Sequence, residues 1–445
     1  MLTSLYTAVS GMNANGTSLS VIGDNIANMN TIGFKSSSVT FADVLSQSVG
    51  TASGSSQIGR GVQVSEISPL FTQGSFETSS SGLDLAVDGD GFFMVNSGNS
   101  TFYTRAGKFS LDSSGNVTNP DGKILQGYLA DAAGNITGTV GDLQIATTQN
   151  PANATTAATL AVNLDATAAV AAGAFTLDGN GDGTQNDPIN FDSSNTITVY
   201  DPQGGAHQVT SYFVKTAANT WAVHYAIEDP SNPGSFMEAG QTTGGVGLPP
   251  VGAATTQALT FNIDGSLAND NSGVAQTFNF GGGMPAQNIA FNYGTGTAEV
   301  PAGTGLDMTT QYAAPFSVMN LTQDGYAAGS LSSVSISTDG IITGMFTNGQ
   351  TRSIGEVALA RFVAPTELTK MGGNLYAASS TSGQAIVGAP DTSGLGKVLS
   401  NSLELSNVDL AQEFVNMISA QRGFQANSKI ITTTDELMQT VLSLK

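Results

Sequence analysis

The residues best suited to metal chemistry lie in the segment Asp-Gly-Asn-Gly-Asp-Gly at positions 178–183. Asp178, Asn180 and Asp182 offer oxygen ligands at alternate positions, and the glycines allow a sharp turn, as in the first half of an EF-hand calcium loop. Such a loop also needs an acidic side chain at its twelfth position, where this chain has Ile189. A turn on an acidic surface explains the segment better, and calcium binding is kept as the lesser alternative.

Side chains suited to acid–base or nucleophilic catalysis are scarce. The chain has no cysteine and only two histidines, His207 and His224, which excludes thiol chemistry, disulfides and any site with three imidazoles. We expect His207 at a surface turn and His224 at a half-exposed strand position. Asp88 and Asp90 resemble a carboxylate pair, but Asp-Gly turn chemistry explains them better. We therefore predict no catalytic residues, no cofactor-binding residues and no enzymatic activity.

The chain has few charged residues, and most of them are acidic. Of 445 residues, 13 are Lys or Arg and 34 are Asp or Glu, which gives a formal net charge of -21. So few basic residues cannot build the positive surface that nucleic-acid binding needs. No apolar run of about 18 residues occurs, so we expect no membrane insertion. The first basic residue is Lys35, so the N-terminus lacks the basic region of a secretory signal peptide.

The apolar residues near the N-terminus have the spacing of a helix. They recur every seven residues, at Leu5, Met12, Leu19 and Ile26. This period predicts a helix with a coiled-coil-like seam. Glycines within the segment make such a helix marginal in isolation.

The C-terminal segment 403–445 repeats this pattern. Its apolar stripe consists of Leu410, Phe414, Met417, Phe424, Ile431 and Met438. Asn407 or Asp409 is expected to cap the helix, because a short polar side chain accepts the free N–H groups of a first turn. An ordinary helix pair closing a globular domain would explain both stripes. Their length and sparse charge instead favour an assembly element, in which the stripes are buried between subunits.

Between the two terminal segments the apolar period changes to two, which is typical of β-strands. Leu85 and Val87 alternate with small or acidic residues, and Asp-Gly-Asp-Gly at 88–91 precedes the apolar Phe92. Asp-Gly supplies the positive φ that tight turns need, so this segment predicts a hairpin. Further Asp-Gly turns occur at 121–122 and 339–340.

A separate acidic β domain is expected at 149–317. Its clearest predicted strands are 196–200, 208–214 and 221–227. Alternation in the last strand places four apolar side chains on one face: Trp221, Val223, Tyr225 and Ile227. The domain contains 13 acidic residues and one basic residue, Lys215. Because dense acids repel one another, we expect this domain to face solvent, outside whatever the termini build.

The predicted fold class is mainly β with long terminal α-helices, in a discontinuous multidomain architecture. A helical, coiled-coil-like core domain accompanies two β domains, the outer inserted in the inner. The expected boundaries are 1–30 and 403–445 for the core domain, 31–69 for an extended linker, 70–148 and 318–402 for the inner β domain, and 149–317 for the outer acidic β domain.

Short motifs at both ends and in the β region resemble the bacterial flagellar axial proteins of the rod and hook. These motifs are LYTAVSGM at 5–12, NIAN at 25–28, TIGFK at 31–35, GDGFF at 89–93, YTRAG at 103–107, LSNVDL at 405–410 and ISAQRGF at 418–424. The large insert is similar to that of the hook members. Distal rod members are generally shorter, so a distal rod subunit is the second choice.

The resemblance implies a structural subunit that leaves the cell through the flagellar type III export apparatus, without a cleaved signal peptide. Outside the cell it polymerises into a curved helical tube, with terminal helices in the core and β domains outside. Such a hook is a universal joint that transmits motor torque to the filament. The implied partners are further copies, the distal rod, the hook cap, the hook–filament junction proteins and the export apparatus. The residues of the two terminal stripes are the expected subunit contacts.

Two alternatives come from other classes. A secreted β-rich adhesin would use the acidic insert as a ligand surface. A calcium-dependent hydrolase would need a convergent catalytic set that the sequence does not offer.

Overall fold

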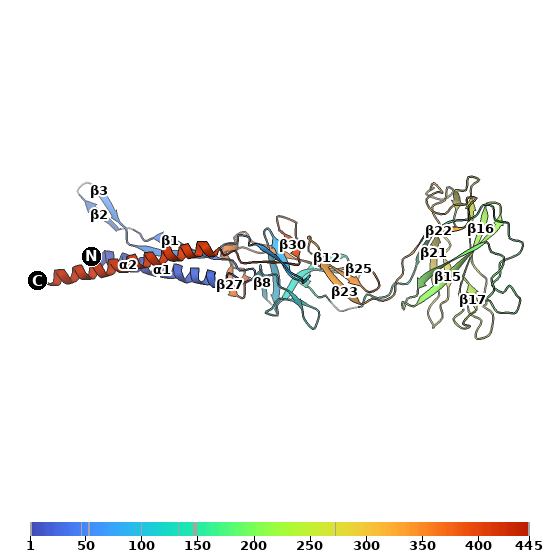
Figure 1. The fold of residues 1–445 in the computed structure, drawn as a ribbon, viewed down its shortest axis with the longest axis horizontal. Helices are drawn as coiled ribbons and strands as arrows, with labels where there is room; N and C mark the ends of the chain where they lie inside the picture. The colour runs from blue at the N-terminus through green and yellow to red at the C-terminus, as the bar shows by residue number, and fades with distance from the viewer. Residues whose placement is uncertain are drawn as a thin grey trace. The chain divides into compact units, whose positions relative to one another are not determined.

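The chain divides into two compact units. The structure, a computed structural model, describes residues 2–45, 47–51, 54–98, 100–131, 133–145, 149–271 and 273–443. Unit 1 comprises residues 1–148, 331–346 and 350–445, and unit 2 comprises residues 149–330 and 347–349. Most elements are β-strands, and a helix lies at each end of the chain (Figure 1). The predicted mainly β class with terminal helices is confirmed.

The terminal helices are α1 (Leu2–Ala27) and α2 (Leu410–Ser443). Asp409 caps α2, because its Oδ1 accepts the backbone N–H of Ala411 at 2.8 Å and of Gln412 at 3.2 Å. Residues 444–445 of the predicted helical segment lie outside the described residues. Within its described residues, neither helix has the apolar length that a bilayer crossing requires.

The helix at the C-terminus starts later than the predicted segment, which began at residue 403. Leu403 lies instead in the short strand β31 (Ser402–Glu404), which pairs antiparallel with β5 (Phe76–Thr78). The backbone hydrogen bonds of residues 402–404 are thus made with a distant strand and not within a helix turn.

The predicted linker at 31–69 contains paired strands. β1 (Ser37–Asp43) pairs antiparallel with β4 (Val62–Pro69), and β2 (Gln47–Thr51) pairs with β3 (Gly54–Ile58). The segment is therefore extended, but its strands are hydrogen-bonded to one another.

A 13-stranded sheet forms most of the β part of unit 1. Its central path runs β23-β24-β25-β11-β7-β8-β28-β27. Its strands are β7 (Phe92–Ser97), β8 (Ser100–Thr104), β9 (Ser110–Leu111), β10 (Val117–Thr118), β11 (Ile124–Ala130), β12 (Ile136–Asp142), β23 (Leu331–Ile336), β24 (Ile341–Phe346), β25 (Thr351–Val357), β26 (Leu359–Arg361), β27 (Thr369–Gly372), β28 (Leu375–Ala377) and β29 (Ile386–Gly388). A short 3-10 helix, η1 (Pro365–Glu367), precedes β27.

The hairpin predicted at residues 88–91 does not form. β6 (Leu85–Asp88) pairs with β30 (Lys397–Ser400), whereas β7 pairs with β8, β11 and β26. Gly89 and Gly91 do have positive φ values, 104° and 137°. The turn chemistry was therefore interpreted correctly, but the chain uses the turn to leave one sheet and enter another. The Asp-Gly turns at 121–122 and 339–340 do connect antiparallel strands.

Two sheets make up unit 2. The first has the order β20-β21-β13-β22, and the second has the order β14-β15-β16-β18-β19 with β17 beside β16. The strands are β13 (Ala157–Asn163), β14 (Ser193–Tyr200), β15 (Ala206–Ala217), β16 (Thr220–Glu228), β17 (Phe236–Glu238), β18 (Thr256–Phe261), β19 (Leu267–Asn269), β20 (Gln276–Phe278), β21 (Gln287–Asn292) and β22 (Ser317–Gln323). Each of the three predicted strands lies within one of these, in β14, β15 and β16.

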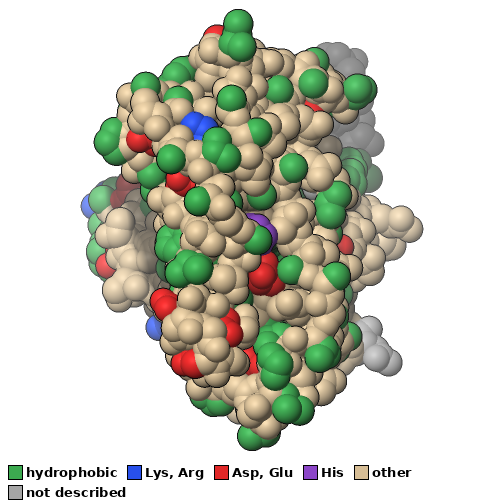
Figure 2. Space-filling model, turned by 90° about the vertical axis from the view of Figure 1, so that its right-hand side faces the viewer, with side chains coloured by type: hydrophobic (Ala, Val, Ile, Leu, Met, Phe, Trp, Pro, Cys, Tyr) green, Lys and Arg blue, Asp and Glu red, His purple; other side chains and the backbone are tan. Residues whose placement is uncertain are grey.

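The predicted apolar face of β16 forms part of the core of unit 2. Trp221, Val223, Tyr225 and Ile227 are all buried in one hydrophobic cluster that draws on both sheets. The surface of unit 2 is acidic, in contrast to this apolar core. Figure 2 shows Asp and Glu side chains scattered over one face, where Lys and Arg are rare. A period of two therefore separated core from surface correctly.

Candidate functional site

The two terminal helices lie side by side and antiparallel (Figure 1). A Cβ placed on Gly11 would lie 2.7 Å from Asn427 Nδ2, and one placed on Gly423 would lie 2.9 Å from Asn15 Oδ1. Gly11 and Gly423 thus each lie directly against a polar side chain of the other helix. The absence of a side chain at these two positions allows the helices to approach closely.

The predicted stripe residues lie beside this seam, and the single chain covers them incompletely. On α1, Leu5, Met12, Leu19 and Ile26 are all half-buried, as are Leu410, Met417 and Ile431 on α2. The exposed fractions are 46% for Phe414, 39% for Phe424 and 39% for Met438. Val415, Ile418, Ile430 and Leu437 of α2 are also exposed. A row of large apolar side chains on one helix is typical of a protein–protein contact surface.

The helix pairing can be tested by cross-linking, because the natural chain contains no cysteine. A Cβ on Gly11 would lie 3.1 Å from Asn427 Cγ, which brings the two Cβ positions near the separation that a disulfide needs. We expect Gly11→Cys combined with Asn427→Cys to form an intrachain disulfide under mild oxidation, seen as a mobility shift on a non-reducing gel. Gly16→Cys with Asn427→Cys is the control and should stay reduced, since no other described segment has an atom within 4 Å of a Cβ at Gly16. Equal cross-linking of both pairs would contradict the observed register.

Asn25 connects the end of α1 to the start of β1 and to α2. Its Nδ2 donates to the carbonyl of Ser37 at 2.9 Å and to Glu413 Oε1 at 3.1 Å. Its Oδ1 accepts the backbone N–H of Ser37 at 2.9 Å. Because Asn25 is buried, these bonds fix how the chain leaves the helix.

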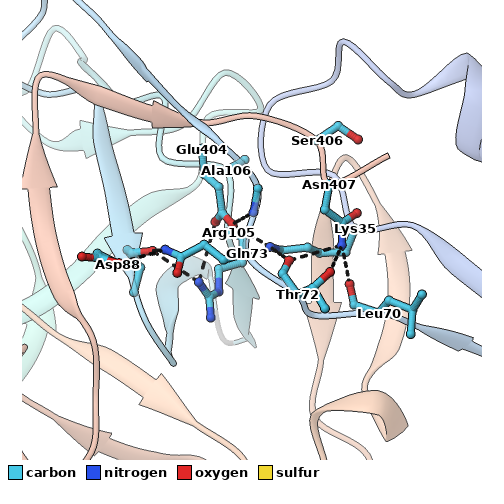
Figure 3. Close-up of polar contacts among 12 residues, drawn as sticks. Lys35, Leu70, Thr72, Gln73, Asp88, Arg105, Ala106, Glu404, Ser406 and Asn407 are labelled. Atoms are coloured by element: carbon cyan, nitrogen blue, oxygen red, sulfur yellow. Dashed lines mark hydrogen bonds and ion pairs between the residues drawn. The ribbon is translucent and has the colours of Figure 1, made fainter. Parts of the chain in front are cut away.

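Lys35, Arg105 and Glu404 form a buried charge cluster where the terminal segments meet the β part of unit 1 (Figure 3). Lys35 Nζ lies 2.6 Å from Glu404 Oε1 and donates to the carbonyl of Thr72 at 2.7 Å. Arg105 Nη1 lies 3.7 Å from Glu404 Oε2. The exposed fractions of the Lys35, Glu404 and Arg105 side chains are 0%, 0% and 3%. One buried carboxylate is therefore shared by two buried cations.

Burial dominates the electrostatics of this cluster. Desolvation lowers the pKa of Lys35 from its ordinary value, and the neighbouring Glu404 carboxylate opposes that change. Desolvation likewise lowers the pKa of Arg105, with Glu404 again opposing it. The carboxylate also accepts the backbone N–H of Gly74 at 2.9 Å, which ties the cluster to the strand that follows.

Asn407 completes the junction from the C-terminal side (Figure 3). Its Oδ1 accepts the backbone N–H of Ser36 at 2.8 Å, and its Nδ2 donates to the carbonyl of Leu70 and to Thr72 Oγ1, both at 2.8 Å. Asn407 was predicted as one of two alternative helix caps, but it instead holds the segments around β1 and β4 against the residues before α2.

The sequence interpretation assigned no role to Lys35, Arg105 or Glu404. A signal was present, because Lys35 is the first basic residue of the chain, and it lies in a stretch with almost no charge. A single cation in such a stretch must be either hydrated at the surface or paired with an anionic side chain. The partner Glu404 is 369 residues away in the sequence, which no local pattern reveals.

The candidate calcium loop uses its oxygens internally. The carboxylate of Asp178 accepts the backbone N–H groups of Gly181 and Gly183, and Asn180 Nδ2 donates to Asp182 Oδ2 at 3.0 Å. Over the described ranges, no group of three or more His, Asp or Glu side chains is arranged to hold a metal ion. The geometry is that of an Asp-rich turn on the surface.

Both histidines belong to unit 2, and Asp88 and Asp90 belong to unit 1. His207 Nε2 is 2.9 Å from Asp201 Oδ2, and its ring stacks on Phe280. His224 Nδ1 is 2.7 Å from Glu238 Oε2 at a half-buried position of β16. Each imidazole thus has one carboxylate neighbour of its own. Asp88 ends β6, and Asp90 lies between the two glycines of the turn.

Four family models match along the chain. They are the flagella basal body rod protein at 5–35, the flagellar hook protein FlgE/F/G D1 domain at 86–169, the flagellar basal body protein FlaE D2 domain at 163–326, and the flagellar basal body rod FlgEFG protein C-terminal model at 399–444. The order of these matches along the chain defines a class, the structural proteins of the bacterial flagellar rod and hook.

Full-length relatives narrow this class. The flagellar hook protein FlgE of Salmonella typhimurium is 35% identical over 98% of this chain and 99% of its own length. FlgE of Borreliella burgdorferi is 35% identical over the full length of both chains. A crystal structure of Helicobacter pylori FlgE2 aligns with 72% of this chain and 98% of its own at 16% identity and a TM-score of 0.48, too low for an argument about fold. The chain belongs to the flagellar hook protein FlgE family, whose members are structural subunits and not enzymes.

Proposed function

We propose that this chain polymerises into the curved tube of a flagellar hook and acts there as a universal joint between motor and filament. The observation that carries the proposal is the row of incompletely covered apolar side chains on α2, including Phe414, Phe424 and Met438. In water this surface is unfavourable, at about 25 cal/mol per Å² of apolar area, and contact with neighbouring copies would bury it.

The arrangement of parts in this tube follows from charge and hydrophobicity. The terminal helices, 1–30 and 403–445, would form the coiled-coil-like core, because their apolar stripes need partners and their charge is sparse. Residues 70–148 with 331–346 and 350–402 would form the inner β domain around that core, because the expected boundary at 317/318 falls inside β22, a strand of unit 2. The acidic residues 149–330, inserted in the inner domain, would lie outermost, where solvent and salt screen their mutual repulsion.

Bending requires contacts of different strength at different radii. Apolar helix contacts in the core would resist sliding, whereas polar contacts between acidic outer domains would rearrange at low cost. Export through the flagellar apparatus without a cleaved signal peptide, an extracellular location, and contacts with the distal rod, hook cap and junction proteins complete this proposal.

Electron microscopy of the purified full chain at high salt tests the proposal directly. We expect curved tubes for the natural chain and for Phe424→Leu, which keeps an apolar side chain on α2. Phe424→Asp should abolish tubes, because assembly would bury an unpaired carboxylate. Circular dichroism should show that the β units of Phe424→Asp remain folded. Normal tubes from Phe424→Asp, or no tubes from the natural chain, would overturn the proposed core.

A further inference from the structure

A cavity of 390 Å³ opens beside the buried charge cluster in unit 1. We call it the Arg105 socket, and define it by Phe71, Asp90, Phe92, Arg105, Arg361 and Phe362. Three aromatic rings therefore surround two guanidinium groups and one carboxylate. The Arg105 guanidinium carbon lies 5.2 Å from the centroid of the Phe92 ring, which keeps the cation against an apolar wall.

Arg105 is a buried cation with unused hydrogen-bonding capacity. Its Nε is buried without a hydrogen-bond partner. Its only ion pair among the described residues is the 3.7 Å contact with Glu404, a carboxylate already bound at 2.6 Å by Lys35. A guanidinium group has five N–H donors, and a buried donor that forms no hydrogen bond raises the free energy of the folded state. The site therefore has more positive charge and more donors than its own acids satisfy.

The other charges of the socket do not remove this excess. Arg361 forms no ion pair with a carboxylate in the part of the chain that the structure describes. Asp90 acts on Arg105 electrostatically but forms no ion pair with it. With two guanidinium groups and one carboxylate, the lining of the socket has a net positive charge in a strongly acidic chain. Planar guanidinium groups bind carboxylates through two parallel hydrogen bonds. A carboxylate is therefore the ligand that suits the socket.

We propose that the Arg105 socket receives an aspartate or glutamate side chain from unit 2 of a second copy of this chain. Unit 2 has the larger excess of carboxylates over basic side chains, with 14 acidic residues against one basic residue. That base, Lys215, is itself buried, and its ammonium donates to the carbonyls of Ala166 and Ala168. Unit 2 therefore presents acids that it cannot neutralise itself. This inference rests on the proposed hook polymer, because assembly into that polymer is what would bring a second copy to the socket.

Photo-cross-linking from the rim of the socket identifies the occupant. Val363 lines the cavity and is 82% exposed, so Val363→Cys carries a benzophenone label as the sole cysteine of the chain. Tubes are assembled from equal amounts of ¹⁵N-labelled and unlabelled chains and then irradiated. We expect mixed-isotope cross-links from Val363→Cys to peptides of residues 149–330. Cross-links within one copy, or only to unit 1, would overturn the inference.

Removal of one guanidinium measures what the contact contributes. We expect Arg361→Gln to raise the critical concentration for tube formation about tenfold, because a charge-assisted hydrogen bond to the bound carboxylate is lost. Arg361→Lys should recover part of the loss, because it keeps the charge without the planar fork. Lys397→Gln is the control, as Lys397 forms an exposed ion pair with Asp391 at 3.7 Å and does not line the socket. An unchanged critical concentration for Arg361→Gln would contradict the socket.

A free carboxylate distinguishes a protein occupant from a small anion. Sodium acetate should raise the critical concentration of the natural chain more than sodium chloride at equal ionic strength, and Arg361→Gln should lose this difference. Acetate binding without cross-links between copies would overturn the inference and assign the socket to a free anion. Absence of tubes from the natural chain would instead contradict the proposed function, so the two failures are distinguishable.

Discussion

Glu404→Gln is expected to destabilise unit 1 by about 3–5 kcal/mol, the usual cost of removing one partner from a buried ion pair. The substitution leaves Lys35 and Arg105 buried without a carboxylate, at exposed fractions of 0% and 3%. The amide keeps the size of the side chain, so packing loss contributes little. The backbone N–H of Gly74 keeps an acceptor in the amide oxygen. The expected loss is therefore electrostatic.

Hydrogen exchange with mass spectrometry measures this effect separately in each unit. Protection should fall in β5, β31 and the segments around Lys35, while unit 2 stays protected, because Trp221 and its cluster lie in other sheets. Glu77→Gln is the matched control, since Glu77 is exposed and pairs across the same two strands with Leu403. If amide protection in unit 1 is the same in the Glu404→Gln and Glu77→Gln chains, the charge cluster does not stabilise the junction.

Gly107→Ala is expected to have the second large effect, a loss of at least about 3 kcal/mol in unit 1. A Cβ at this position would lie 1.6 Å from the carbonyl oxygen of Leu85, so the backbone of one segment must move. The same two residues are joined by a hydrogen bond from the Leu85 N–H to the Gly107 carbonyl at 2.8 Å. Moving them apart breaks this bond and shifts buried Leu85 in the core.

Chemical denaturation combined with hydrogen exchange of β6 and β30 checks this expectation. Gly59→Ala is the control in the same unit, because apart from its chain neighbours no described residue has a heavy atom within 4 Å of the Cβ position. We expect Gly59→Ala to stabilise unit 1 by up to about 1 kcal/mol, since the added methyl group meets no other segment and narrows the unfolded ensemble. A Gly107→Ala chain as stable as Gly59→Ala would show that β6 accommodates a side chain there.

The sequence predicted best what depends on neighbouring residues. The alternation around Trp221 places the same side chains in the core that the structure buries, and both terminal helices form where the apolar period indicated them. Local spacing suffices here because a strand or helix has one repeat and one apolar face. The family followed from motifs that are also local.

Local spacing could not predict which distant strand or helix each element packs against. The turn at 88–91 has suitable residues for a hairpin, yet β6 pairs with β30, more than 300 residues later. The same holds for the helices, where Gly11 and Gly423 lie against polar side chains of the other helix while large apolar residues such as Phe414 stay exposed. Turn chemistry specifies a backbone conformation but not the strand that pairs next.

By itself, the sequence determined the class of this protein, its terminal helices, its β-rich middle and the concentration of acid in residues 149–317. Only the tertiary structure decided which buried charges meet, and it did so at Lys35, Arg105 and Glu404. A buried charge without a partner has a high free energy, so these three residues are stable in the interior only when they lie together. Their contact depends on how distant segments pack and not on their spacing in the sequence. For that reason the junction of helices and sheet, and the Arg105 socket beside it, became visible only in the folded molecule.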